Sequence, residues 1–249
     1  MRGQRDKVTF SPRGVAASFI IVMAALLFSC GLPTSEYLYP PAEFSQTSAN
    51  LVVLYHNSNN VHDDNGFNGY KIYYRVFDAY DNAYRSWDYL SQHLTSSNVT
   101  SIASSKGYYP LLKETSDRTS YDYSTLIPYS VCESGTYDYF ALNMNSTTTW
   151  TITGITGSSS AEVLSYVVRN KGSSTTDPSY ADFCVTSNYV EGDQDYDGAA
   201  SSPSSIFIVY FAVAYGKSSS LADIYSDPNE TGYDSIIEPS SSNLYTPGS

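Results

Sequence analysis

The chain has 249 residues, with 25 Asp and Glu, 13 Lys and Arg, and a formal net charge of −12. Four of the basic residues and one of the acids precede residue 30, so the rest of the chain carries a net charge near −15. Such acidity repels nucleic-acid phosphates and anionic lipid head groups, which argues against nucleic-acid binding and against membrane attachment through a basic patch. The 25 Tyr residues and the abundant Ser and Asn favour strands joined by polar turns.

Residues 1–29 have the layout of a secretory signal peptide. The four basic residues at the start precede an uncharged apolar run from Val15 to Phe28, and the small residue Ser29 follows. A helix of that length spans roughly 21 Å, which is short of the ~30 Å hydrocarbon core of a bilayer. A permanent transmembrane helix is therefore the weaker interpretation.

The segment Leu27-Phe28-Ser29-Cys30 resembles the lipobox of bacterial lipoproteins, in which an apolar and a small residue precede an invariant cysteine. The resemblance implies that signal peptidase II cleaves before Cys30 and that Cys30 carries fatty acyl chains such as palmitate. It also implies an extracytoplasmic protein held on a bacterial membrane by its lipid, with the inner and outer membranes both open. The alternatives are an ordinary cleaved signal with a chance cysteine, or a short retained helix.

The lipidated N-terminus leads into a proline-containing segment, residues 30–49, which we expect to be a flexible tether. The folded domain is then expected over residues 50–237, and a disordered Ser- and Pro-rich tail over residues 238–249.

Period-two patterns predict strands through most of this domain. The clearest alternation runs from Gly69 to Asp78, with Tyr70 and Ile72 on one face and Lys71 on the other. The run from Ser205 to Tyr215 is apolar on both faces, so we expect it to be central in a sheet. Other strands are expected at Asn50–His56, Leu126–Cys132, Tyr137–Asn143, Trp150–Ile155, Glu162–Asn170 and Ala181–Ser187.

One window, Asp81 to Ser96, has helical periodicity instead. The apolar residues in this window and just before it follow one another at steps of three and four and form one stripe: Tyr80, Tyr84, Trp87, Leu90 and Leu94, with Asp81 as the expected N-cap. We expect the helix to lie in an insertion at about residues 79–124, and its stripe to pack in the core.

The strand pattern and its turn signals predict a mainly β fold, a β-sandwich of the fibronectin or immunoglobulin kind with this helical insertion. The stretch from Phe67 to Arg75 resembles the third strand of fibronectin type III domains, where a G-Y-x-[IV]-Y-Y pattern places aromatic residues in the core. It also resembles stretches in spirochaete lipoproteins of unassigned function.

Two cysteines remain once Cys30 is assigned to lipid. Cys132 and Cys184 would lie in an oxidising compartment, where disulfides persist, and a bridge between them would stabilise the fold by about 4 kcal/mol in the entropic model. Two buried free thiols are the alternative.

The segment from Asp193 to Gly198 matches the opening D-x-D-x-D-G of calcium-binding loops, in which Asp193, Asp195 and Asp197 would supply carboxylates. An EF-hand would need Glu at the twelfth position, where Ser204 stands. A looser Ca²⁺ loop and a solvated acidic turn are therefore the two interpretations, and no other cofactor is indicated.

Trp87 and Trp150 are candidate ligand contacts, because Trp and Tyr commonly anchor protein partners or stack on sugar rings. The alternative is that both pack in the interior.

The sequence contains no recognisable catalytic motif. It therefore favours a membrane-anchored, non-catalytic binding or structural module of the cell envelope. The partner could be another envelope protein, a host surface component or a glycan. The alternative function is an extracytoplasmic hydrolase, for example one that acts on glycans.

Overall fold

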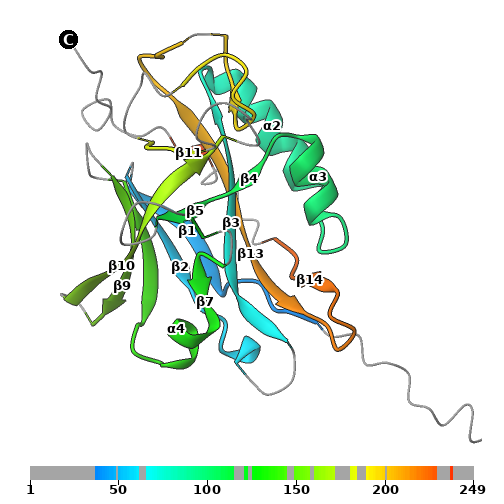
Figure 1. Ribbon diagram of the computed structural model, residues 1–249, viewed down its shortest axis with the longest axis vertical. Helices are drawn as coiled ribbons and strands as arrows, with labels where there is room; N and C mark the ends of the chain where they lie inside the picture. Colours follow the sequence, from blue (N-terminus) through cyan, green and yellow to red (C-terminus); the bar gives the residue numbers. More distant parts are fainter. Residues whose placement is uncertain are drawn as a thin grey trace, which may run out of the picture. The chain divides into compact units, whose positions relative to one another are not determined.

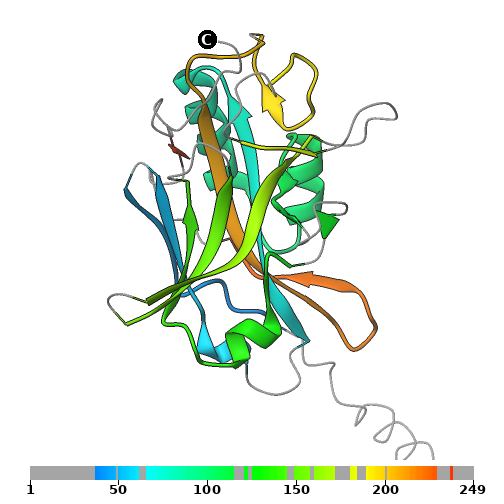
Figure 2. The same cartoon turned by 60° about the vertical axis from the view of Figure 1, so that its left-hand side comes forward.

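The computed structural model of the chain describes residues 37–48, 50–61, 66–114, 121–122, 125–144, 149–157, 160–171, 180–183, 189–199, 201–228 and 236–237. They belong to one compact unit. Its fold is mainly β: two curled, mostly antiparallel sheets face each other, and the longer helices lie against the second sheet (Figures 1 and 2). The predicted β-sandwich with a small helical part is confirmed.

The first sheet is built largely from neighbouring antiparallel strands. Its order is β1 (Glu43–Ser48), β2 (Leu51–Tyr55), β8 (Tyr139–Asn143), β9 (Trp150–Thr156), β10 (Ser160–Asn170), β5 (Leu112–Glu114) and β6 (Tyr121–Asp122), with β11 (Tyr180–Ala181) also paired to β10.

The second sheet is centred on two long antiparallel strands. Its order is β12 (Tyr196–Asp197), β3 (Phe67–Phe77), β13 (Phe207–Lys217) and β14 (Asp223–Tyr225). The short strands β4 (Tyr109–Pro110) and β7 (Ile127–Pro128) pair with β3, and β15 (Ile236–Ile237) pairs with β13. The β12–β3 pair is parallel.

Strands β3 and β13 bury both of their faces. On β3, Tyr70, Ile72 and Tyr74 point into the main core between the sheets, as the predicted alternation requires. Tyr73 and Phe77 point the other way, into a second hydrophobic cluster beneath the helices. The pattern alone suggested a strand with one buried face, and the helical layer accounts for the second. The expectation that residues 205–215 form a central strand is confirmed by β13.

Helices α2 (Tyr80–His93) and α3 (Val99–Ser105) cover the second sheet. Leu90 and Leu94 are buried and Trp87 packs against the same cluster, but Tyr80 is 50% exposed, so only the later part of the expected apolar stripe packs in the interior. The helix begins one residue earlier than expected, and Ala79 occupies the N-cap position without a side-chain hydrogen bond, so Asp81 lies in the first turn. A single 3-10 turn, η1, spans Ser58–Asn60.

Three expected boundaries need correction. Strand β1 lies inside the expected tether, and both Leu38 and Phe44 are buried in the main core, so the folded unit begins before residue 50. The expected insertion ends sooner, because β4 and β5 join the sheets. The expected strand from Leu126 to Cys132 forms only the short β7, and helix α4 (Tyr129–Glu133) follows Pro128.

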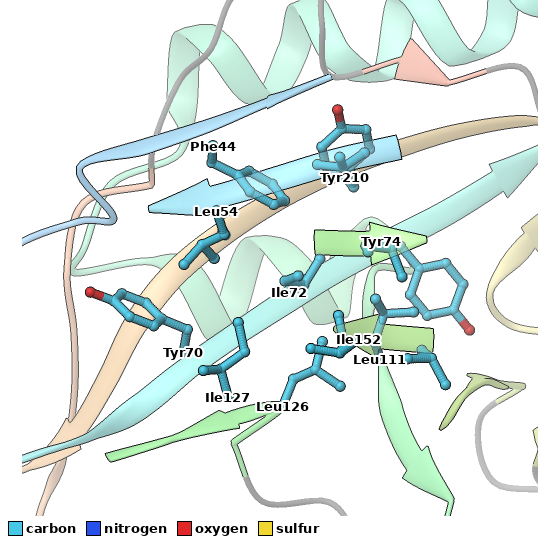
Figure 3. Packing of buried hydrophobic residues seen from close by; sticks show 14 of the residues in the cluster. Phe44, Leu54, Tyr70, Ile72, Tyr74, Leu111, Leu126, Ile127, Ile152 and Tyr210 are labelled. Carbon is cyan, nitrogen blue, oxygen red and sulfur yellow. The ribbon is translucent and has the colours of Figure 1, made fainter. Parts of the chain in front are cut away.

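Among the described residues, the main core combines ten buried aromatic residues with a larger number of aliphatic ones. Figure 3 shows Phe44 next to Tyr210, with the hydroxyl groups of Tyr70 and Tyr74 at opposite ends of the labelled cluster. Phe44 and Tyr210 meet edge to face across the two sheets, with their ring centroids 5.1 Å apart.

The expected signal peptide, Cys30 and the C-terminal tail lie outside the described residues. Within the described part of the chain, every helix is too short or too polar to cross a bilayer.

Candidate functional site

The three aspartates of the D-x-D-x-D-G segment are bound to basic side chains. Asp195 is fully buried, and its carboxylate accepts hydrogen bonds from Arg169 at 2.7 and 3.0 Å. Asp193 lies 3.2 Å from both Arg169 and Lys171. Asp197 is half exposed and lies 3.2 Å from Arg75.

The buried pair of Asp195 and Arg169 is completed by groups from other elements. The Tyr74 hydroxyl on β3 donates to Asp195 at 2.6 Å and accepts from the backbone N–H of Asn170 at 2.6 Å. The Arg169 guanidinium lies 4.0 Å from the centre of the Tyr189 ring. Each charged group therefore has several partners, as buried charges require.

This environment shifts two pKa values. Burial, and then the Asp195 carboxylate, raise the pKa of Tyr74 well above its ordinary value, so its hydroxyl keeps its proton. Burial disfavours the charge on Arg169, but the neighbouring Asp195 and the tyrosines outweigh it, and the pKa of Arg169 is raised. The Tyr74 hydroxyl and the Arg169 guanidinium therefore both keep their protons at neutral pH.

This arrangement does not support the predicted calcium loop, and the buried Asp195 does not fit the alternative of a solvated acidic turn. Asp193 and Asp195 do converge, but on the Arg169 guanidinium, which occupies the place a cation would take. Asp197 turns away to Arg75. Among the described residues, no group of three or more His, Cys, Asp or Glu side chains is arranged to hold a metal ion. The three carboxylates of the motif are present, but they bind basic side chains.

The two tryptophans also separate. Trp150 is 1% exposed and stacks on Phe183 in the main core, with ring centroids 4.4 Å apart, so the prediction that it contacts a ligand is wrong. Trp87 is partly buried against the helical cluster, beside the Tyr84 ring at 5.7 Å. Its main contacts are within the fold.

Cys132 lies in α4 and is buried in the main core. Burial raises the pKa of its thiol to about 12, so as a thiol it is protonated at neutral pH. Cys184 lies outside the described residues, and the disulfide between the two therefore stays a prediction. A thiol count on the unfolded, unreduced chain would decide between a bridge and two free cysteines.

The face of the first sheet that points away from the core carries an exposed aromatic patch. Because Leu54 and Phe140 point into the core, their neighbours Tyr55 and Tyr139 point to the opposite face. We call this surface the open face. Its exposed and half-buried apolar members come from β2, β8, β9 and β10: Leu51, Tyr55, Tyr139, Ile155, Val163 and Tyr166.

The open face carries no charged side chain on its four strands, but Glu43 on β1 and Glu114 on β5 pair with Tyr55 and Tyr166 at its edges. Tyr55 is 36%, Tyr166 46% and Val163 51% exposed, and the Tyr55 and Tyr139 rings stack at 5.1 Å. The interior-facing residues of α2 and α3 belong to the cluster on the second sheet, so these two helices leave the open face uncovered.

A polar cleft lies on the other sheet, between α2, the end of α3, β3 and β12. Its charged lining includes Arg75, Arg85, Lys106 and Asp197. The sequence singled out only Asp197 among them, as a member of the D-x-D-x-D-G segment, because Arg75, Arg85 and Lys106 come from separate elements and match no motif. The one sequence feature that could have drawn attention to the basic residues of the cleft was the scarcity of Lys and Arg in so acidic a chain.

Comparison with family models, with curated proteins and with solved structures finds no match to this chain.

Proposed function

We propose that this chain is a lipid-anchored, non-catalytic binding module of a bacterial cell envelope, and that its open face docks another envelope protein. The lipobox-like segment ending at Cys30 supports the anchor. The observation that carries the binding role is the open face, an aromatic and apolar surface on a domain whose remaining surface is strongly acidic.

The size of the open face suits contact with a protein. Four strands at a spacing of about 4.8 Å and some five residues along each strand give an area of roughly 300 Å². Only part of this area is exposed and apolar, because Asn143 and Thr151 lie on the same face and Val53 and Ala141 are buried. With its surroundings it could form one side of a small or transient interface.

The chemistry of the open face favours a protein over a sugar. The centres of protein interfaces are poor in charged side chains and rich in Tyr, as this surface is. The Tyr55 and Tyr139 rings stack on each other, so each offers less free ring area to a sugar.

The test is crosslinking on intact cells with the full chain. A photo-reactive amino acid replaces Tyr55 or Tyr166 on the open face, or Tyr80, which is 50% exposed on α2. We expect the two open-face positions to capture the same envelope protein and the α2 position not to capture it. Capture of a second copy of this chain, capture from all three positions alike, or no capture would contradict the proposal.

A pair of charge variants provides the matched control. Val163→Lys places a cation in the open face, whereas Leu221→Lys changes an apolar residue that is 78% exposed elsewhere. Only the first should abolish the crosslink, since burying an unpaired charge in an interface is costly. Hydrolysis of a panel of glycans by the wild-type chain would instead favour the alternative function.

The anchor has its own test. Cells fed a labelled fatty acid should label the wild-type chain, and Cys30→Ser should remove both the label and membrane association. Membrane association that survives Cys30→Ser would mean that something other than a lipid holds the chain.

A further inference from the structure

The polar cleft on the second sheet is separate from the open face and has a different chemistry. It has a volume of about 390 Å³, which falls within the range of small-molecule sites. Asn82, Arg85, Ser86 and Tyr89 line it along one side of α2, because they recur at intervals of three and four residues. Arg75, Lys106 and Asp197 complete the lining.

The cleft concentrates positive charge in an acidic domain. Only nine Lys and Arg residues follow Cys30 in the sequence, and three of them line this one cleft. Asp197 is the one carboxylate in its described lining, so the cleft has a surplus of two positive charges. A single ligand with two negative charges would balance that surplus.

Arg75 is held in place by the backbone around it. One terminal nitrogen donates to the Lys106 carbonyl oxygen at 2.5 Å, and the other lies 3.2 Å from Asp197. Gly107 has a φ of +70°, and a Cβ at this position would lie 3.2 Å from the Arg75 guanidinium. Each terminal nitrogen of Arg75 has a second N–H, so the side chain can still donate to a ligand from a fixed position.

The other two basic side chains differ in their restraint. The Lys106 ammonium lies 3.9 Å from the centre of the Tyr89 ring. Arg85 is exposed, and it forms no ion pair with any of the described residues. The cleft thus combines the fixed guanidinium of Arg75, the partly fixed ammonium of Lys106 and the side chain of Arg85, which is able to close over a ligand.

The Tyr89 ring is already occupied by other side chains. Its ring is stacked on the His93 ring at 4.3 Å, and Lys106 also lies over it. Tyr89 therefore does not offer a free platform on which a sugar ring or a base could stack.

We propose that this cleft binds a phosphate dianion, either free or at the end of a monoester. Arginine forks suit phosphate oxygens, and the surplus of two charges suits a dianion better than a carboxylate. The acidic surface still repels long polyanions such as nucleic acids, but a single small anion enters the local field of three cations. The inference is independent of the open face, because the two surfaces share no residue.

The experiment is calorimetric titration of the full chain in nonionic detergent with inorganic phosphate, glucose 6-phosphate and acetate. We expect saturable binding of phosphate and at least tenfold weaker binding of acetate. Equal affinity for phosphate and the sugar phosphate would indicate the free ion as the ligand, and tighter binding of the sugar phosphate would indicate a monoester. No saturable phosphate binding, or acetate binding as tightly as phosphate, would overturn the proposal.

Two variants locate the site. Arg85→Gln should weaken phosphate binding about tenfold, and the matched control Lys217→Gln should leave it unchanged, although both remove one positive charge. Lys217 pairs with Asp223 at the far end of β13, outside the cleft. Arg85 is exposed, so its replacement should leave the fold intact, which the unfolding curve checks. If both variants weaken binding equally, the effect is one of net charge and the cleft is not the site.

Discussion

The three aspartates of residues 193–197 allow a test of how burial determines the contribution of an ion pair to stability. We consider the replacement of each aspartate by Asn, which removes the charge but keeps nearly the same shape. A calcium loop would make the three residues cooperate in holding one ion. The structure instead pairs Asp195 with Arg169, Asp193 with both Arg169 and Lys171, and Asp197 with Arg75, and the three aspartates differ in their degree of burial.

Asp195→Asn should be the most damaging of the three. Both side chains of the Asp195–Arg169 pair are 0% exposed, so the change leaves a charged guanidinium in the interior with only Asp193 nearby. Breaking a buried pair from one side costs about 3–5 kcal/mol. For a domain of this size that corresponds to a decrease in Tm of roughly 6–20 °C.

Asp197→Asn is the matched control from the same motif. Its side chain is 49% exposed and that of Arg75 is 21% exposed, so solvent screens the pair and the loss should stay below about 1 kcal/mol. Asp193→Asn should fall between these values, because its side chain is 10% exposed and touches two cations, Arg169 and Lys171.

The assay is urea denaturation of the wild-type chain and the three variants, with and without calcium. We expect Asp195→Asn to lose the most stability, Asp193→Asn less and Asp197→Asn the least. Calcium should not change the stability of any of them. The reasoning is refuted if Asp195→Asn and Asp197→Asn cost the same. It is also refuted if calcium stabilises the wild-type chain and each variant abolishes that gain, which would restore the calcium loop. A double variant, Arg169→Met with Asp195→Leu, should recover much of the loss, because it leaves no unpaired charge.

Three further predictions concern the core, the pH response and the N-terminal boundary. Trp150→Ala should lower the free energy of unfolding by about 3–5 kcal/mol, because it leaves a cavity beside Phe183, and denaturation measures this loss. The yield of the open-face crosslink per folded molecule should not change. A loss of the crosslink in molecules that are still folded would mean that Trp150 does contact the ligand. Burial lowers the pKa of His56, so the folded state holds this ring neutral while the unfolded state takes up a proton as the pH falls through about 6.5. The stability that His56 contributes is therefore complete above that pH and declines below it, and the difference in unfolding free energy between wild type and His56→Gln should shrink from about pH 7.5 to pH 5; a constant difference would contradict the burial argument. A chain that starts at residue 50 should be less stable than one that starts at residue 37, because it lacks β1 and the buried Leu38 and Phe44; equal urea midpoints would show that β1 adds nothing to the fold.

The sequence predicted the long elements because periodicity has room to show in them. Strands β3 and β13 each span eleven residues, and α2 spans fourteen. Short elements carry no such signal. Strand β1 has one fully buried residue, Phe44, which is too few to show a period. The short apolar run before Cys132 fits a strand and a helix equally well.

The functional residues were harder to predict, since their partners lie far away in the sequence. The D-x-D-x-D-G segment was found, but Arg169, 26 residues before Asp195, decides its role. Trp150 has the residue type of an interface anchor, and only its place in β9, facing the core, shows that it packs internally. The open face was not predictable as a surface, because it requires the register between four strands.

In a domain with many more acids than bases, the partner of each cation indicates what that cation does. Arg169 is taken up with the buried network, and Lys217 pairs with Asp223 at the surface. Asp195 and Asp197 lie in one short stretch of chain. Strand β12, which includes Asp197, pairs with β3 through only two residues. The Asp195 backbone carbonyl also accepts the N–H of Val76 at 2.8 Å, so the network fixes this stretch against the sheet. The position at which Asp197 meets Arg75, and with it the charge balance of the cleft, therefore depends on a buried ion pair that no ligand would touch.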